Sequence, residues 1–131
     1  MTYMGRPYYP LWLDNLADDV TLEAAAMDGT ARGADDVRSI LVIAREQYEH
    51  QEFNYTGPCG ENSFLEDYTS SVRGIPTSVV VLVNFNADGQ TQHVVASYRP
   101  RTSLMHFARL LSEKFAGTPI AEHFAAGESS R

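Results

Sequence analysis

The stretch Thr77-Ser78-Val79-Val80-Val81-Leu82-Val83-Asn84-Phe85 decides the fold of this chain. It is almost continuously apolar and rich in β-branched residues, which predicts a strand covered on both faces. Residues 86–89 then turn the chain, and Gly89 can take the positive φ angle of a short hairpin loop. A return strand is predicted over residues 90–99, and Pro100 ends it. One face of the return strand would carry Val94, Ala96 and Tyr98, and the other Thr91, His93, Val95 and Ser97.

Length and charge limit the classes of protein to which the chain can belong. Its 131 residues suit one domain with its own core, and its formal charge of −7 disfavours binding to phosphate backbones or anionic membranes. No apolar run reaches the ~18 residues of a membrane span. The single cysteine cannot form an internal disulfide, and the first ten residues do not resemble a signal peptide. We therefore expect one cytoplasmic domain over residues 1–131 that binds neither nucleic acid nor membrane.

Further elements are predicted on both sides of this hairpin. Pro10 suits the first turn of a short helix through Leu16, and residues 20–24 alternate as a short strand. Residues 34–48 form the clearest helix, and strands are predicted over 52–56 and 64–73. After Pro100, Thr102 or Ser103 can cap a helix over residues 103–116. The tail, residues 120–131, is expected to be frayed. The apolar stripe of the clearest helix consists of Val37, Ile40, Leu41, Ala44 and Tyr48.

Three motifs carry a family resemblance. They are Leu16-Ala17-Asp18-Asp19-Val20-Thr21-Leu22-Glu23, then Gly29-Thr30-Ala31-Arg32-Gly33 leading into Ala34-Asp35-Asp36-Val37-Arg38, and Phe85-Asn86-Ala87-Asp88-Gly89 before the strand ending Tyr98-Arg99-Pro100. With the order short helix, strand, helix and four antiparallel strands, the chain resembles the nuclear transport factor 2-like superfamily. That superfamily includes the SnoaL-like polyketide cyclases and the ketosteroid isomerases. The resemblance covers residues 12–100 and favours a single SnoaL-like domain with its core over residues 11–100.

The resemblance implies an α+β fold, the cystatin-like α+β roll. A strongly curved antiparallel sheet wraps into a cone, and helices on its concave side enclose an apolar pocket. Members commonly pair through the convex face, so we expect a homodimer through the outer face of the sheet. In the central strand, Val79, Val81, Val83 and Phe85 would then face the cone, and Val80 and Leu82 a partner or an outer layer. Because the first helix is short, the extra C-terminal helix or a neighbouring subunit would supply the missing cover.

Two positions depart from the ketosteroid isomerases within this resemblance. Where their catalytic carboxylate base would stand, just after Thr21-Leu22-Glu23, this chain has Ala24, and where their second acid would stand it has Val81. An isomerase of that pattern is therefore not expected. Enzymes of the family generally do acid–base chemistry without a metal, by holding carboxyl, imidazole or phenol groups in an apolar hollow. No cofactor is expected.

Candidate site residues follow from strand parity. Tyr55, Tyr68, Gln92 and Tyr98 are predicted to face inward, whereas Glu66 and Asp67 lie on opposite faces, so that only one of the two carboxyl groups can enter the cone. The candidate catalytic residues are Asp67, Glu66 and Tyr68. The candidate ligand-binding residues are Trp12, Tyr55, Tyr68, Val81, Gln92 and Tyr98.

The remaining reactive side chains lack motifs. His93 falls on the predicted outer face, and His50, His106 and His123 have no ligand spacing such as H-x-x-x-H, so no metal site is expected. Cys59 follows Gly57-Pro58 in a predicted loop with no motif linking it to a histidine.

Two functions stay open from the sequence. The first is a SnoaL-like pocket protein that binds or transforms a small, largely apolar molecule by metal-free acid–base chemistry. As an enzyme it would be an isomerase, cyclase, dehydratase or hydrolase. The alternative is a non-catalytic homodimeric interaction module whose cone is filled by its own side chains.

Overall fold

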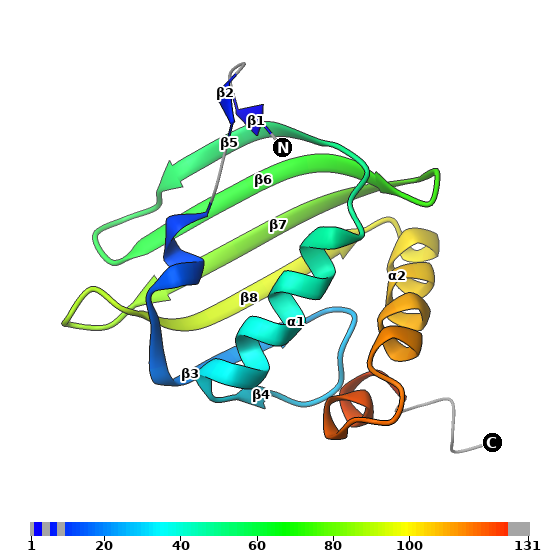
Figure 1. Ribbon diagram of the computed structural model, residues 1–131. Coiled ribbons are helices and arrows are strands. Elements are labelled where there is room, and N and C mark those ends of the chain that lie inside the picture. Colours follow the sequence, from blue (N-terminus) through cyan, green and yellow to red (C-terminus); the bar gives the residue numbers. More distant parts are fainter. Residues whose placement is uncertain (1, 4–5, 8–9, 126–131) are drawn as a thin grey trace.

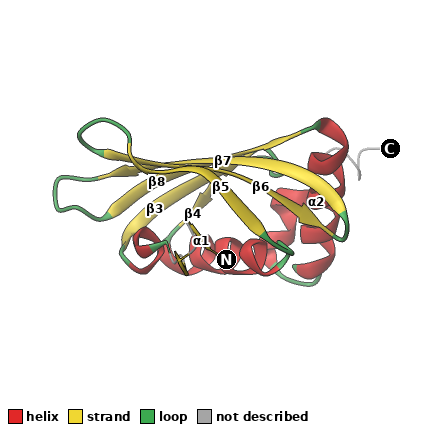
Figure 2. Ribbon diagram, turned by 90° about the horizontal axis from the view of Figure 1, so that it is seen from above, coloured by secondary structure: helices red, strands yellow, loops and turns green. Residues whose placement is uncertain are grey.

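The computed structural model describes residues 2–3, 6–7 and 10–125, and in these ranges eight strands form one curved sheet in the order β2-β1-β5-β6-β7-β8-β3-β4. The strands are β1 Thr2–Tyr3, β2 Arg6–Pro7, β3 Leu16–Ala24, β4 Ala31–Arg32, β5 Gln51–Pro58, β6 Ser63–Val72, β7 Ile75–Phe85 and β8 Thr91–Arg99. The helices are α1 Ala34–Glu46, α2 Arg101–Lys114 and α3 Glu122–Ala125, with 3-10 turns η1 Leu11–Asp14 and η2 Pro119–Ala121. Helix α1 crosses the concave side and α2 stands at one end of the sheet, while no described helix lies over the convex side (Figures 1 and 2).

Strand β7 lies in the middle of the sheet and pairs antiparallel with β6 and β8. Its inward residues Val79, Val81 and Val83 are at most 5% exposed, whereas the outward Val80 and Leu82 are partly exposed. The predicted division of this strand between two faces is confirmed. The sheet is mixed rather than purely antiparallel, because β3 joins β8 and β1 joins β5 in parallel.

Helix α1 covers the concave side, as its periodicity predicts. Val37, Ile40, Leu41 and Ala44 are buried in one core cluster with the inward valines of β7. The first turn carries two aspartates, whose charge favours the positive end of the helix dipole. The short first helix is reduced to the single turn η1, which nevertheless buries Trp12.

Helix α2 begins two residues earlier than predicted, and the expected cap is wrong. Pro100 precedes the helix, and neither Thr102 nor Ser103 caps it. The Ser103 hydroxyl instead donates to Thr77 Oγ1 at 3.1 Å, which ties α2 to β7. The helix buries Phe107, Leu110, Leu111 and, just after its end, Phe115. It thus supplies part of the cover that the short first helix leaves out.

The chain beyond α2 is ordered further than predicted. Residues 119–125 form η2 and α3, and Phe124 is buried and stacks on Phe115 with 5.8 Å between ring centroids. A frayed tail from residue 120 is therefore wrong for residues 120–125, and residues 126–131 lie outside the described ranges. Within those ranges, no helix has both the length and the apolar character needed to cross a bilayer.

The contribution of α2 to the core can be measured with two substitutions on that helix. Leu111 is 2% exposed and Met105 is 53% exposed. Leu111→Ala should lower the free energy of unfolding by about 2–5 kcal/mol, because it leaves a cavity in the core. Met105→Ala should change it by less than about 0.5 kcal/mol. Urea denaturation followed by circular dichroism measures both, and equal small losses would contradict a structural role for α2.

Candidate functional site

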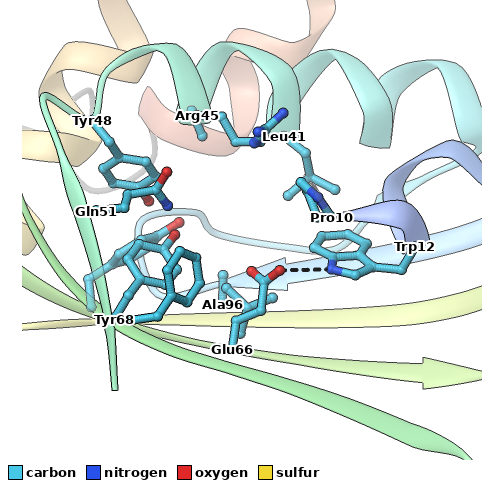
Figure 3. Close-up of a pocket in the computed structure, with 13 residues that line it drawn as sticks. Pro10, Trp12, Leu41, Arg45, Tyr48, Gln51, Glu66, Tyr68 and Ala96 are labelled. Carbon is cyan, nitrogen blue, oxygen red and sulfur yellow. Dashed lines mark hydrogen bonds between the residues drawn. The ribbon is translucent and has the colours of Figure 1, made fainter. Parts of the chain in front are cut away.

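A cavity lies between α1, η1 and the concave face of β5 to β8 (Figure 3). We call it the concave cavity. Its free space is about 430 Å³ with the mouth included, of which about 30 Å³ can hold the centres of water molecules. That is room for only a few waters, so the walls lie close together. Its lining consists of Pro10, Trp12, Leu41, Ala44, Arg45, Tyr48, Gln51, Phe53, Glu66, Tyr68, Val81, Ala96 and Tyr98.

Glu66 is the one acidic residue in this lining and is only 5% exposed. The Trp12 indole N–H donates to Glu66 Oε2 at 3.0 Å, which fixes the carboxyl group against the floor of the cavity (Figure 3). Asp67 points to the other face, where its Oδ1 lies 3.4 Å from Asn54 Nδ2. Of the two carboxyl groups that the sequence left open, Glu66 is therefore the inward one.

Three tyrosine hydroxyl groups gather beside Glu66. Hydrogen bonds join Tyr48 to Tyr68 and Tyr98, and Gln51 to Tyr68. Burial raises the pKa of Tyr98 to about 12 and the pKa values of Tyr48 and Tyr68 well above 10. The neighbouring tyrosines raise the pKa of Tyr48 further, and the Glu66 carboxylate adds to the increase at Tyr68. All three phenols are therefore neutral hydrogen-bond donors at pH 7.

Aromatic packing holds this tyrosine cluster in place. Tyr48 meets Tyr68 edge-on at 5.6 Å between ring centroids and stacks on Phe107 of α2, also at 5.6 Å. Tyr98 packs on the other side of Phe107 at 5.0 Å, and Phe53 packs on Tyr68 at 4.9 Å. Helix α2 thus supports the cluster from behind without lining the cavity itself.

Four of the six predicted ligand-binding residues line the cavity: Trp12, Tyr68, Val81 and Tyr98. Tyr55 and Gln92 do not, and the predicted inward direction of both is wrong. Tyr55 is 41% exposed, and its hydroxyl donates to the Pro58 carbonyl at 2.7 Å. Gln92 lies toward solvent, where its amide donates to Asp19 Oδ1 at 3.0 Å.

Two shifts of strand register, one in β5 and one in β8, explain these two errors. In β5, Phe53 pairs with Tyr68 but Tyr55 pairs with Asp67, so the register shifts at Asn54 and the next side chain turns outward. In β8, Asn84 pairs with His93 but Phe85 pairs with Thr91, so Gln92 is the extra residue. Strand parity fails beyond such a shift.

The second shift also reverses the prediction for Thr91. We expected this residue on the outer face, yet it is fully buried, and its hydroxyl donates to the Trp12 carbonyl at 2.8 Å. The same side chain therefore anchors the residue that holds Glu66.

Sequence reasoning missed three polar lining residues, Tyr48, Arg45 and Gln51. Tyr48 is the last residue of the predicted apolar stripe, and its spacing predicts a core side chain. Its position at the end of the stripe places its hydroxyl group beside the sheet. Arg45 comes from the same helix and reaches across the cavity mouth (Figure 3). Gln51 begins β5, one residue before the predicted strand.

The carboxyl group of the cavity comes from β6, the strand on which both candidate carboxyl groups were predicted. Val81 stands where the second acid of ketosteroid isomerases would be, and Glu66 is its direct neighbour across the β6–β7 pair. Directly opposed residues have Cβ atoms about 5 Å apart, so Glu66 and Val81 are neighbours in the wall of the concave cavity. Ala24 lines a smaller apolar cavity next to the first.

Outside the concave cavity, the remaining reactive side chains are dispersed. Among the described residues, no group of three or more histidine, cysteine, aspartate or glutamate side chains is placed to hold a metal ion. Cys59 is exposed. His93 is on the convex face as predicted, where Nδ1 lies 2.5 Å from Thr21 Oγ1 and Nε2 lies 3.1 Å from Glu23 Oε2. It links β8 to β3 and does not line the cavity.

A buried carboxyl next to neutral phenols has a definite chemical capacity. A carboxylate can take a proton from a bound molecule, and a phenol can donate a hydrogen bond to an oxygen that gains negative charge. The apolar walls strengthen both interactions because they exclude water.

Comparison with known proteins places the fold. No protein-family model and no curated protein matches the sequence. The structure is similar to an uncharacterized protein with a cystatin-like fold from Silicibacter pomeroyi DSS-3 (TM-score 0.74, 18% identity, covering 82% of this chain and 75% of that one). It is also similar to a steroid delta-isomerase from Pseudomonas aeruginosa (TM-score 0.73, 16% identity, 79% and 77%). A third similar structure is an NTF-2 like protein of unknown function from Burkholderia xenovorans LB400 (TM-score 0.55, 17% identity, 69% and 73%).

These identities are low, so the likeness concerns the fold and not the activity. It agrees with the curved sheet and the helix on its concave side. The chain therefore has the nuclear transport factor 2-like fold, the cystatin-like α+β fold that its sequence predicts.

Proposed function

We propose that the concave cavity binds a small, largely apolar molecule carrying one carbonyl or hydroxyl oxygen, and that Glu66 and Tyr68 act on it by acid–base chemistry. The observation that carries this proposal is the Glu66 carboxyl, which is 5% exposed and held by Trp12 inside an apolar hollow. A buried acid in a cavity is a candidate for function because its burial costs stability.

The two groups take complementary roles in this proposal. Glu66 removes or returns a proton, and its hydrogen bond from Trp12 keeps the carboxyl pointed into the cavity. Tyr68 is neutral at pH 7, so it donates a hydrogen bond to the ligand oxygen. A carboxylate base with a phenol donor suits proton transfer next to a carbonyl group. One protein with the same fold is a steroid delta-isomerase, which is compatible with an isomerase here.

Ligand entry requires movement at the cavity mouth. The space open to water centres, about 30 Å³, is too small for an organic molecule. Arg45 and Gln51 are long, partly exposed side chains at the rim, so we expect the opening movement to involve them, with Gln51 giving up its hydrogen bond to Tyr68. The narrow cavity with its largely apolar lining therefore favours a compact, largely apolar ligand.

Glu66→Gln tests the proposed acid–base role, and Asp67→Asn is its matched control on the opposite face. Trp12 is the only tryptophan and touches Glu66, so its fluorescence reports on the cavity. We expect wild type and Asp67→Asn to bind cyclic enones and phenols alike. Glu66→Gln should slow the conversion of a β,γ-unsaturated ketone to its conjugated isomer by about 10²–10⁴-fold, as loss of a general base does.

The outcome of that comparison is decisive either way. The glutamine introduced by Glu66→Gln has the same shape as glutamate, and its carbonyl oxygen can still accept from the indole, so a folding defect is not expected. Wild-type protein that neither binds these compounds nor isomerises the ketone would refute the proposal, as would equal rates in all three proteins. Absorbance of the conjugated ketone and titration of Trp12 fluorescence provide the two readouts.

The tyrosine cluster predicts a loss of stability in alkali. The folded pKa of Tyr98 is about 12, above the value near 10 of an unfolded tyrosine, so the unfolded chain loses the proton first. The contribution of protonated Tyr98 to the free energy of unfolding is complete below pH 10 and is lost as the pH rises from 10 to 12. Tyr98→Phe should therefore flatten the fall in unfolding free energy above pH 10. Tyr55→Phe, on the convex face, is the control and should leave the fall unchanged.

The narrowness of the concave cavity and the apolar residues on the convex face favour a second candidate function. We propose that the chain forms a homodimer through this face, as an interaction module. Leu65, Leu82 and Val95 pair directly across β6, β7 and β8 and are partly exposed on it. An apolar row in the middle of an uncovered sheet is suited to a second copy of the same sheet.

Sedimentation equilibrium tests the dimer. The wild-type chain should sediment at about twice its mass of 14.6 kDa, and Leu82→Arg should sediment as a monomer, because the interface would bury an unpaired charge. Met105→Arg, on the exposed side of α2, should remain a dimer. Circular dichroism checks that both variants are folded. A monomeric wild type at micromolar concentration would rule out this function.

A further inference from the structure

A second, wider cleft lies away from the concave cavity, between the β6–β7 turn and α2. It is lined by Arg73, His106, Arg109, Leu110 and Glu113. We call it the Arg73 cleft. Its free space is similar, about 420 Å³, but about 210 Å³ can hold the centres of water molecules. The turn and the helix meet at one end of the sheet (Figure 1). The cleft therefore has room for a small polar group without any rearrangement.

The charges around the Arg73 cleft are unusual for this acidic chain. Two guanidinium groups and one imidazole face one carboxyl group, that of Glu113, although the net charge of the chain is −7. Within the part of the chain that the structure describes, neither Arg73 nor Arg109 takes part in an ion pair. Two guanidinium groups in one cleft, neither bound to a carboxylate, offer hydrogen-bond donors and positive charge to an external anion.

The imidazole of His106 lines the cleft beside the two arginines. Its Nδ1 is buried and has no hydrogen-bond partner among the described residues, so this nitrogen does not open into the cleft. The two guanidinium groups are therefore the donors that the cleft offers to an anion.

Arg73 also stands in a backbone conformation that arginine rarely adopts. Its φ is +49° and that of Gly74 is +80°, and Val72 pairs with Ile75, so these two residues form a two-residue hairpin turn. Such turns favour Asn-Gly, because asparagine tolerates positive φ better than long side chains do. The turn itself therefore does not account for an arginine here.

We propose that the Arg73 cleft binds the phosphate group of a small, soluble phosphomonoester. Arg73 and Arg109 would contact the phosphate from the turn and from the helix. Each guanidinium group has several N–H donors, so the pair matches a dianion with three oxygens better than a carboxylate, which offers two. Glu113 and the buried Leu110 complete the lining, and a carboxylate there can accept a hydrogen bond from a hydroxyl group of the organic part.

This site is independent of the proposed acid–base function. Arg73, His106 and Arg109 line the Arg73 cleft alone, and none of them lines the concave cavity. Variants in the Arg73 cleft therefore leave Glu66 and its tyrosine neighbours unchanged, and either proposal can fail without the other.

Calorimetric titration of the full chain at constant ionic strength tests the phosphate site. The probes are inorganic phosphate, glycerol 3-phosphate and acetate. We expect both phosphates to bind, and acetate to bind at least about tenfold more weakly. Arg73→Asn and Arg109→Gln should each weaken phosphate binding by about tenfold, the effect of losing one charged hydrogen-bonding group. Lys114→Gln removes the same charge from the exposed end of α2, outside the cleft, and should bind as the wild type does.

Arg73→Asn separates binding from folding. Asparagine suits the positive φ at position 73, so this variant should melt at the same temperature or higher while losing affinity. Absence of phosphate binding by the wild type would overturn the proposal, and so would equal binding by the arginine variants and Lys114→Gln. Equal affinity for acetate would overturn the assignment to phosphate. Binding to phosphatidic acid vesicles without binding to either soluble phosphate would exclude a soluble ligand.

Discussion

The concave face of the sheet has to be covered, and the rest of the structure follows from this requirement. Val79, Val81 and Val83 present an apolar surface at most 5% exposed, and burial of such a surface is favourable whichever element provides the cover. This chain uses three different covers: the helix α1, the single turn η1 and the end helix α2. Because hydrophobic burial has no directional demand, a first helix reduced to one turn can be compensated by an added helix elsewhere without changing the sheet.

Polar groups inside this apolar hollow are subject to a stricter demand, because each needs a partner. The Glu66 carboxyl has the Trp12 indole, and the hydroxyl groups of Tyr48, Tyr68 and Tyr98 have one another. The hollow thus holds a carboxyl group on β6, directly across the strand pair from Val81. The fold determines where an ionisable group can be buried, while the sequence chooses which strand supplies it.

Much of this arrangement could be predicted from the sequence, and the errors have one main cause. Strands β5 to β8, α1, the inward valines of β7 and the opposite directions of Glu66 and Asp67 follow from periodicity. By contrast, β1 and β2 were not predicted, and β3 begins at Leu16, which was expected in the short first helix. Tyr55 and Gln92 failed because the register shifts at Asn54 and within β8, where no glycine or proline marks an irregularity. Tyr48 was missed for a different reason: helical spacing identifies a buried ring but says nothing about its hydroxyl group. The start of α2 differed because Ser103 bonds to Thr77 instead of capping the helix.

The irregularity in β8 also affects the hydrogen bond to the candidate acid. Its effect passes through two contacts, from Thr91 to Trp12 and from Trp12 to Glu66. With Gln92 as the extra residue, Thr91 turns inward, and its hydroxyl holds the Trp12 carbonyl at 2.8 Å. That bond anchors η1 against the sheet, and the indole N–H of the same tryptophan then reaches Glu66 at 3.0 Å. A strand with regular alternation would turn the Thr91 hydroxyl to the outer face and leave η1 without this anchor. The irregularity that made the sequence-based register fail therefore also helps to hold Trp12 against the carboxyl group of the site.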